Sequence, residues 1–313
     1  MRVLVTGGFG FLGARLACHL AGAGCCVRLG SRRHLPSPGW LPQAETVWTN
    51  WDDADALVAA CEGSDVVVHA AGMNSPDCAA DPVGALLFNG VATARLAQAA
   101  TRAGVSHFIY LSSAHVYASP LIGRLDEHVC PRNLHPYASS HLAGETAVLQ
   151  IAAQGKLKAT VLRLSNAFGA PVTADANCWM LLFNDLCREA VTYGRLTLRS
   201  NPQQQRDFIA ISDVVRAINW LLSLSGDGAQ GVFNIGAGSS LALSDMAQII
   251  RAGCQRTLGF APEICLPSQD AATPAALDFR IDRLLATGFT PGNDFDAEIA
   301  ETLKFCLHLE AAS

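Results

Sequence analysis

Three glycines near the start of the chain are spaced to hold a phosphate group. Gly7, Gly10 and Gly13 follow the apolar run Val3–Val5, which predicts a strand, and a helical pattern begins at Gly13. Glycine permits a tight turn and lets the backbone approach a pyrophosphate, while the first turn of the helix offers free N–H groups to the anion. The order of strand, glycine turn and helix therefore predicts a dinucleotide-binding site.

The residues after the second expected strand bear on which dinucleotide binds. The adenosine ribose would lie there, and sites that prefer NAD usually carry Asp or Glu to bond its 2′-hydroxyl. This chain has Ser31, Arg32 and Arg33 instead. A carboxylate would repel a 2′-phosphate, whereas arginine can pair with it through two N–H groups. The sequence favours NADP(H) over NAD(H), with solvated loop arginines as the alternative interpretation.

The composition indicates a folded protein and argues against several classes of partner. Half of the 313 residues are apolar and 16% are charged, without the bias of a disordered chain. The formal net charge of −5 argues against a nucleic-acid-binding surface. Polar residues interrupt every apolar stretch before it reaches the length of a membrane span. The chain runs from Met1 straight into the glycine turn, so we expect no signal peptide and a cytoplasmic protein.

The eleven cysteines are scattered along the chain. They form no CxxC pair and no Cys/His cluster with the spacing of a zinc site. We therefore expect reduced, mostly buried cysteines and no bound metal.

Strand and helix patterns alternate through the first two-thirds of the chain. Apolar runs predict strands over Arg2–Val5, Val27–Leu29, Asp65–Ala70, His107–Leu111, Ala159–Arg163, Asp207–Ile211 and Val232–Ile235. Helical patterns cover Gly13–Gly22, Asp53–Cys61, Val83–Ala103, His135–Ala153, Asp213–Leu224, Leu243–Ala252, Phe279–Ala286 and Ala297–Leu309. A loop and a helix together are expected over Ala174–Glu189.

This alternation predicts an α/β fold, a doubly wound parallel Rossmann sheet with a smaller C-terminal substrate lobe. We expect residues 1–165 to form the NAD(P)-binding domain, with 205–235 returning to it. Residues 166–204 and 236–313 would form the smaller substrate-binding lobe.

A serine pair, a tyrosine and several later motifs carry a family resemblance. The strand at His107–Leu111 ends in Ser112-Ser113, and Tyr137 follows 24 residues after Ser113. Together with the glycine turn, these residues resemble the extended short-chain dehydrogenase/reductase family, the NAD(P)-dependent nucleotide-sugar epimerases and dehydratases. Further matches, in order, are Val68–Ala71, Asn89, Val116-Tyr117, Glu145, Arg163–Gly169, Arg206–Ile209 with Asp213, and Phe233–Gly236. The resemblance covers nearly the whole chain.

The resemblance implies an enzyme and gives roles to individual residues. Tyr137 would be the general acid/base at a carbinol or carbonyl group as hydride moves to or from nicotinamide, and Ser113 would bond the same oxygen. Asn166 and Arg206 would face the diphosphate of the substrate. The expected cofactor-binding residues are Gly7, Gly10, Phe11, Leu12, Gly13, Ser31, Arg32, Arg33, Asn50, Trp51, Ala70, Ala71 and His141.

His141 is where the chain departs from the family. The family places lysine four residues after the tyrosine, and here that position is histidine; the lysines are Lys156, Lys158 and Lys304. A phenol with a pKa near ~10 is a poor base at neutral pH unless a neighbouring positive charge stabilises the phenolate. Imidazole is mostly neutral at pH 7, so three outcomes follow. The enzyme is slow or has an altered pH dependence, a nearby carboxylate keeps His141 protonated, or binding persists without redox chemistry.

The residues after Ser113 bear on the type of reaction. Dehydratases of the family place Asp-Glu there, and this chain has Ala114 and His115. Dehydration is therefore disfavoured, and C4-type epimerisation or keto-reduction of a nucleotide-linked sugar is expected. His115 would contact the substrate or act as a further acid/base, with a partly exposed histidine of no role as the alternative.

Two other functions stay open: reduction of a carbonyl compound that carries no nucleotide, and NADP(H) sensing by a catalytically weakened regulatory protein. Relatives use the helices expected at Val83–Ala103 and His135–Ala153 to dimerise, so the resemblance implies a homodimer.

Overall fold

A computed structural model of the protein describes residues 1–267 and 275–312, which divide into two compact units. The first unit contains Met1–Ser119, Glu127–Leu164 and Ile218–Asn234. The second contains Pro120–Asp126, Ser165–Ala217 and the described part of Ile235–Ser313. Each unit has its own sheet and core.

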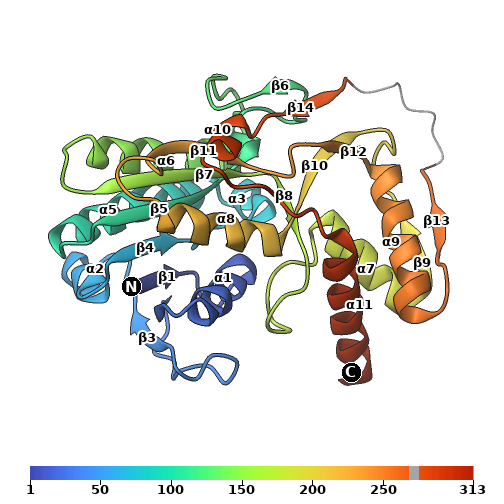
Figure 1. Ribbon diagram of the computed structural model, residues 1–313, viewed down its shortest axis with the longest axis horizontal. Coiled ribbons are helices and arrows are strands. Elements are labelled where there is room, and N and C mark those ends of the chain that lie inside the picture. Colours follow the sequence, from blue (N-terminus) through green and yellow to red (C-terminus); the bar gives the residue numbers. More distant parts are fainter. Residues whose placement is uncertain (268–274, 313) are drawn as a thin grey trace. The chain divides into compact units, whose positions relative to one another are not determined.

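A seven-stranded sheet forms the centre of the first unit, in the order β11-β7-β5-β4-β1-β2-β3 (Figure 1). The pairs from β7 to β3 are parallel. The strands are β1 (Arg2–Thr6), β2 (Cys26–Ser31), β3 (Glu45–Trp48), β4 (Val66–His69), β5 (His107–Ser113), β7 (Lys158–Leu164) and β11 (Gly231–Ile235). Chain order reverses at β1, which lies between β4 and β2, and dinucleotides bind at such a reversal. The predicted α/β fold class is confirmed.

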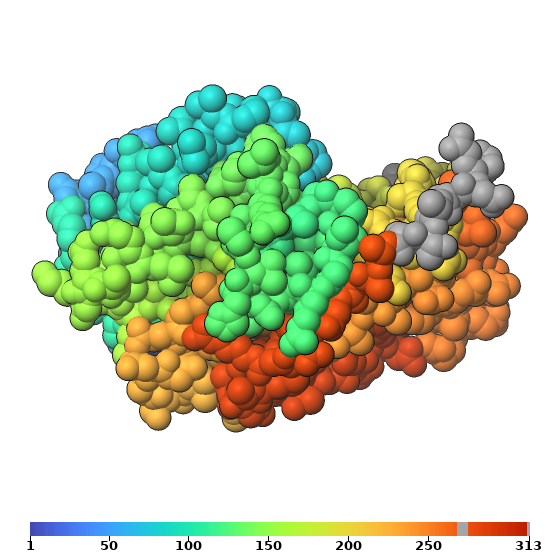
Figure 2. All heavy atoms as spheres, turned by 90° about the horizontal axis from the view of Figure 1, so that it is seen from above, coloured from blue at the N-terminus to red at the C-terminus, as the bar shows by residue number. Residues whose placement is uncertain are grey.

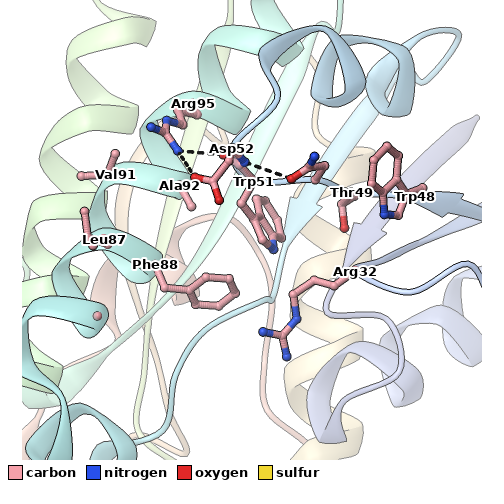
Figure 3. A pocket seen from close by; sticks show the side chains of 12 residues that line it. Arg32, Trp48, Thr49, Trp51, Asp52, Leu87, Phe88, Val91, Ala92 and Arg95 are labelled. Carbon is pink, nitrogen blue, oxygen red and sulfur yellow. Dashed lines mark hydrogen bonds and ion pairs between the residues drawn. The ribbon is translucent and has the colours of Figure 1, made fainter.

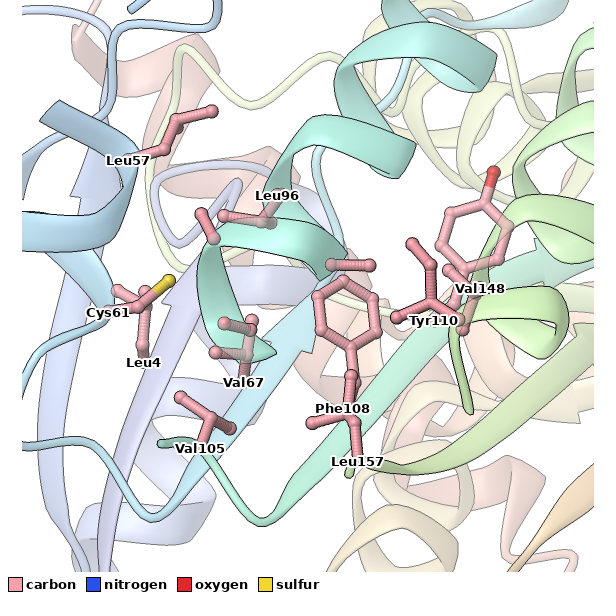
Figure 4. Close-up of a cluster of buried hydrophobic side chains, with 14 of the residues drawn as sticks. Leu4, Leu57, Cys61, Val67, Leu96, Val105, Phe108, Tyr110, Val148 and Leu157 are labelled. Atoms are coloured by element: carbon pink, nitrogen blue, oxygen red, sulfur yellow. The ribbon is translucent and has the colours of Figure 1, made fainter. Parts of the chain in front are cut away.

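Helices cover this sheet on both faces. They are α1 (Phe11–Gly22), α2 (Ala54–Cys61), α3 (Ser75–Ala80), α4 (Pro82–Ala85), the π-helix η1 (Leu86–Ala92), α5 (Thr93–Arg102), the 3-10 turn η2 (Ala114–Val116) and α6 (Pro136–Ala152). Residues of α2, α5 and α6 pack with Leu4, Val67 and Phe108 of the sheet in one buried cluster (Figure 4). The buried residues of α1 lie outside this cluster, on the other face.

The described residues of the second unit form three small sheets. Their orders are β12-β10-β8, β13-β9 and β14-β6. The strands are β6 (Gly123–Leu125), β8 (Asn166–Phe168), β9 (Arg195–Thr197), β10 (Gln205–Ala210), β12 (Ser240–Ala242), β13 (Glu263–Cys265) and β14 (Leu277–Phe279). The helices are α7 (Leu182–Tyr193), α9 (Leu243–Leu258), α10 (Asp282–Ala286) and α11 (Phe295–Ala312), while α8 (Ile211–Ser223) runs from this unit into the first. Side chains of α7, α9 and α11 share one apolar core.

The region around Asp207 differs from its expected place. We expected 205–235 to return to the Rossmann domain, whereas only Ile218–Asn234 lies in the first unit. Strand β10 instead pairs with β8 and β12 in the second unit. The strand was predicted from its apolarity, but apolarity does not indicate which sheet a strand joins.

Two predicted helices are wrong in extent. The helix expected over Val83–Ala103 is interrupted by the π-helix η1. Within the loop and helix expected over Ala174–Glu189, the helix starts at Leu182 and runs to Tyr193. The pattern at Phe279–Ala286 divides into the end of β14 and helix α10. The short strand β3 was missed because four residues give too little alternation to detect.

The segment from α4 to α5 (cyan) reaches the surface of the first unit (Figure 2). Val83, Leu86 and Leu87 in this segment expose 71%, 49% and 57% of their surface. Across residues 1–267 and 275–312, the helices are too short or too polar to cross a membrane.

Candidate active site

The glycine turn joins β1 to α1 at the point of strand reversal. Gly7 has a φ of +68°, and a Cβ on it would lie 2.7 Å from the backbone of Ala70 and Ala71, at the end of β4. A Cβ on Gly13 would lie 2.1 Å from the carbonyl oxygen of Gly7. Both positions therefore exclude any side chain. Ala70 and Ala71, two of the expected cofactor-binding residues, therefore lie beside the glycine turn.

Helix α1 begins directly after this turn with an open N-terminus. Gly10 is its N-cap, so no side chain caps the first turn, and no acidic residue lies in it. The N–H groups of Phe11, Leu12 and Gly13 therefore stay available to an anion. The turn fits the diphosphate of a dinucleotide.

A cavity of about 490 Å³ lies beyond the ends of β2 and β3 (Figure 3). It brings together three of the predicted cofactor-binding residues, Arg32, Asn50 and Trp51. Trp51 meets Phe88 of η1 edge to face, with ring centroids 5.5 Å apart, and its buried indole N–H has no hydrogen-bond partner within the described residues. The wall thus offers flat aromatic surfaces and an unused donor, which suit an adenine ring.

The charge at this cavity comes from Arg32. Its guanidinium lies 5.6 Å from the centre of the Phe88 ring. The carboxylate of Asp52, which also lines the cavity, is paired with Arg95 at 2.7 Å. Ser31 is buried and accepts the backbone N–H of Arg33, whereas Arg33 is exposed and does not line the cavity.

Ser113 and Tyr137 meet at the carboxyl end of β5. Ser113 is the last residue of that strand, and its hydroxyl accepts the N–H of His115 at 3.2 Å. Tyr137 lies in the first turn of α6, where its N–H is accepted by the Nδ1 atom of His135. Burial raises the pKa of Tyr137, and its hydrogen bond with Ser113 lowers it in part. The phenol therefore keeps its proton at neutral pH.

His141 lies one helical turn after Tyr137, and the ring centroids are 4.5 Å apart. Only 6% of its surface is exposed, and burial lowers its pKa to about 4. The hydrogen-bond partner of its ring is the Tyr110 hydroxyl, 2.9 Å from Nδ1. The imidazole is neutral, and no carboxylate of the described residues keeps it charged. Of the three outcomes predicted for His141, the one with a carboxylate that holds it protonated is therefore wrong.

A buried chain of hydrogen bonds behind His141 went unrecognised in the sequence. Asn89, in the π-helix, accepts a hydrogen bond on its carbonyl oxygen from the Thr93 hydroxyl at 2.7 Å. The Thr93 hydroxyl lies 2.9 Å from Nε2 of His69, and Nδ1 of His69 lies 2.6 Å from the Thr6 hydroxyl. Tyr110 belongs to an apolar strand, where a tyrosine usually serves packing, so no local signal marked it.

A buried ion pair lies beneath the serine pair. Arg163 of β7 contacts Glu145 of α6 at 2.7 Å, and the Ser112 hydroxyl donates to the same carboxylate. The Arg163 guanidinium also stacks on Tyr117, whose hydroxyl donates to Asn234. This group positions β5 against α6 and thereby Ser113 against Tyr137.

The expected substrate-binding residues are placed in different units. Asn166 and Arg206 lie on the adjacent strands β8 and β10 of the second unit. The amide of Asn166 donates to the Asp207 carbonyl oxygen at 2.9 Å. The side chain of Arg206 makes no hydrogen bond within the described residues, and burial lowers its pKa. His115 belongs to the 3-10 turn of the first unit and is half-buried.

Asp207 stabilises this part of the second unit. Its carboxylate accepts the Ser165 hydroxyl and the N–H groups of Ala237 and Gly238. Burial raises its pKa to about 6, although these hydrogen bonds act in the opposite direction. Asp207 is thus a structural residue that anchors the strand carrying Arg206.

Comparison with known proteins identifies the family. A model of the NAD dependent epimerase/dehydratase family matches residues 3–236. The chain belongs to this family. It is 29% identical over 257 residues to a GDP-6-deoxy-D-mannose reductase of Pseudomonas aeruginosa, covering 80% of this chain and 79% of the relative. It is 28% identical over 269 residues to a dTDP-glucose 4,6-dehydratase of Streptomyces niveus, covering 81% and 78%.

Among solved structures, the chain is similar to MoeE5 in complex with UDP-glucose and NAD. The TM-score is 0.80 at 25% identity, and the match covers both chains completely. The predicted family and the Rossmann architecture are confirmed.

Proposed function

We propose that this protein is an NADP(H)-dependent oxidoreductase of nucleotide-linked sugars that reduces a keto-sugar, with C4 epimerisation as the related reaction of the same site. The observation that carries the proposal is the group of Ser113, Tyr137 and His141, which stands beside a glycine turn fitted to a dinucleotide. The named relatives act on nucleotide sugars, which supports this class of substrate.

The protonation state of the site favours reduction over oxidation as its first step. When bound, the dinucleotide supplies the hydride to the carbonyl carbon of the substrate. Tyr137 is protonated, so its O–H can donate to the carbonyl oxygen while the Ser113 hydroxyl holds that oxygen. Oxidation of a carbinol would instead need the phenolate, and a neutral His141 gives it little electrostatic support. Epimerisation begins with that oxidation and is the slower reaction on this basis.

Two features support NADP(H) as the cofactor. No carboxylate follows β2, and Arg32 turns its guanidinium toward the cavity that contains Asn50 and Trp51. Arginine pairs with a phosphate monoester through two hydrogen bonds, which a 2′-hydroxyl cannot match. Arg33, one residue further on, adds positive charge at the same end of β2.

The substrate side is proposed from the family resemblance and from the residues present. Asn166 and Arg206 would contact the diphosphate of the sugar nucleotide, and the unpaired Arg206 guanidinium suits that charge. His115 would be a further substrate contact. Dehydration is disfavoured because Ala114 and His115 replace the acidic pair that eliminates water in dehydratases.

We also propose a homodimer and a cytoplasmic location. The exposed apolar side chains of Val83, Leu86 and Leu87 lie on the segment that dimerises in relatives. Size-exclusion chromatography with light scattering would detect a dimer, and Leu86→Glu would shift it toward monomer.

All eleven cysteines are free, which suits the reducing compartment of the proposed cytoplasmic location.

The test starts from purified protein and the nucleotide that it retains. We expect NADPH to bind more tightly than NADH, and to be consumed with UDP-, GDP- or dTDP-linked 4-keto sugars. Tyr137→Phe should keep NADPH affinity and lower turnover by about 100-fold or more. Tightly retained NAD⁺ together with interconversion of UDP-glucose and UDP-galactose would contradict the proposal of a reductase.

One alternative has an observation in its favour. The neutral His141 leaves the phenolate without a cation, as expected of a protein that senses NADP(H) without turnover. NADPH binding without turnover across the sugar panel would support this alternative, and His141→Lys should then create activity.

A further inference from the structure

The ring of His141 has one nitrogen inside the protein and one directed elsewhere. Nδ1 faces the Tyr110 hydroxyl at 2.9 Å. Nε2 has no hydrogen bond within the described residues. It is also not one of the fully buried polar atoms that lack a partner, so some of its surface is accessible. A Cβ on Gly72 would lie 3.9 Å from Nε2, which is ordinary van der Waals contact. Nε2 is therefore free to meet a ligand, and its protonation decides whether it donates or accepts.

The Tyr110 hydroxyl has one proton and two acceptors within reach. Nδ1 of His141 is at 2.9 Å and the carbonyl oxygen of Asn89 is at 3.4 Å. The longer contact is at the limit of a hydrogen bond, and the Thr93 hydroxyl already donates to that carbonyl at 2.7 Å. The proton of Tyr110 therefore goes to Nδ1, which must be unprotonated to accept it.

The rest of the buried chain agrees with this assignment. Since Thr93 gives its proton to Asn89, it must accept one from Nε2–H of His69. Nδ1 of His69 then accepts from the Thr6 hydroxyl. Each hydroxyl in this series of hydrogen bonds donates one proton and each imidazole is neutral, so every hydroxyl and ring nitrogen in the series has a partner except Nε2 of His141.

Packing keeps the Tyr110 ring in place. It is 1% exposed and stacks on His69, with ring centroids 5.6 Å apart and planes at 24°. A Cβ on Gly144 of α6 would lie 2.7 Å from the Tyr110 oxygen, so a glycine at this position makes room for the hydroxyl. The hydroxyl is thereby held where it meets Nδ1.

We propose that Tyr110 is a positioning residue that locks His141 in the Nε2–H tautomer, so that a neutral imidazole presents a single N–H donor to a ribose hydroxyl of the bound dinucleotide. This inference rests on the proposed function for the identity of the ligand, but the tautomer itself does not depend on it. His141 thus takes over the hydrogen bond, though not the charge, that lysine supplies in relatives.

The decisive measurement is ¹⁵N NMR of the ligand-free protein labelled at histidine. The two ring nitrogens resonate differently when protonated and unprotonated, and the spectrum of His141→Gln identifies the signals of His141. We expect a protonated Nε2 and an unprotonated Nδ1 at neutral pH in the wild type. A protonated Nδ1 would overturn the proposal, and this result needs no folded Tyr110 variant.

The variant pair Tyr110→Phe and Tyr117→Phe tests the role of the hydroxyl. Both tyrosines are buried, at 1% and 2% exposed, but the Tyr117 hydroxyl donates to Asn234 and not to His141. Tyr110→Phe should average the two His141 nitrogen signals and weaken NADPH binding about fivefold, which corresponds to one hydrogen bond. Tyr117→Phe keeps the ring that stacks on Arg163 and should leave the two His141 nitrogen signals unchanged.

Unchanged His141 signals in Tyr110→Phe, or an equal loss of NADPH affinity in both variants, would refute the role of Tyr110. If the wild type carries the expected tautomer but binds neither NADPH nor NADH, the proposed function fails. The lock on the tautomer would then stand, but its role toward a ribose would be overturned.

Discussion

Acidification should destabilise the first unit through three histidines, two buried and one half-buried, that are neutral in the folded protein. Burial lowers the pKa of His69 to about 3, and the pKa values of His107 and His141 to about 4. The charge of His141 also lowers the pKa of His69, and the charge of Lys158 lowers that of His107. In the unfolded chain each histidine titrates near ~6.5.

The sign follows from which state binds more protons. Between pH 6.5 and about 4 the unfolded chain is protonated at these histidines and the folded unit is not. The free energy of unfolding therefore decreases as the pH decreases. At pH 5 each histidine costs about 2 kcal/mol relative to pH 8, and the three together about 6 kcal/mol. This loss is comparable to the total stability of many domains.

Urea unfolding at several pH values between 8 and 5 measures this loss. Tryptophan fluorescence reports mainly on the first unit, because four of the five tryptophans lie there. His107→Gln removes one titrating group and should reduce the loss by about a third, whereas the exposed His34→Gln should leave it unchanged. A loss below about 2 kcal/mol in the wild type would refute the reasoning.

The second unit should respond in the opposite direction. Burial raises the pKa of Asp207 to about 6, so the folded unit binds this proton more readily than the unfolded chain does. Its contribution therefore adds stability as the pH falls from 6 toward 4. Two unfolding transitions that separate at acidic pH would be the visible consequence.

Three further variants test individual residues. His141→Lys places an ammonium one helical turn from Tyr137, which should lower the pKa of the phenol. Because sugar oxidation needs the phenolate, the acidic limb of its pH profile should move to lower pH, and an unmoved profile would contradict this. Arg32→Ala should raise the Kd for NADPH about tenfold and change the Kd for NADH less than twofold, measured by fluorescence titration. Equal effects on both Kd values would exclude a contact between Arg32 and the 2′-phosphate. Glu145→Gln leaves Arg163 buried without its counter-charge and should lower the free energy of unfolding in urea by about 3 kcal/mol. A decrease under about 1 kcal/mol would argue against this ion pair as a support of the site.

The sequence alone was sufficient for the fold class and for the glycine turn between β1 and α1, because both depend on local rules. Gly7 and Gly13 occupy positions that admit no side chain, and such positions are readable from residue type. Alternating strands and helices allow few topologies, of which a parallel sheet with covered faces is the common one. The pairing of Ser113 with Tyr137 followed from family motifs at known spacing.

Only the tertiary structure decided the state of His141. Spacing placed it one turn from Tyr137, but its charge depends on burial and on Tyr110, which comes from another strand. Likewise Phe88 joins Trp51 and Arg32 at one cavity although the three come from separate segments of the chain. Desolvation and hydrogen-bond direction are properties of an assembled interior, and so no local pattern of residues could specify them.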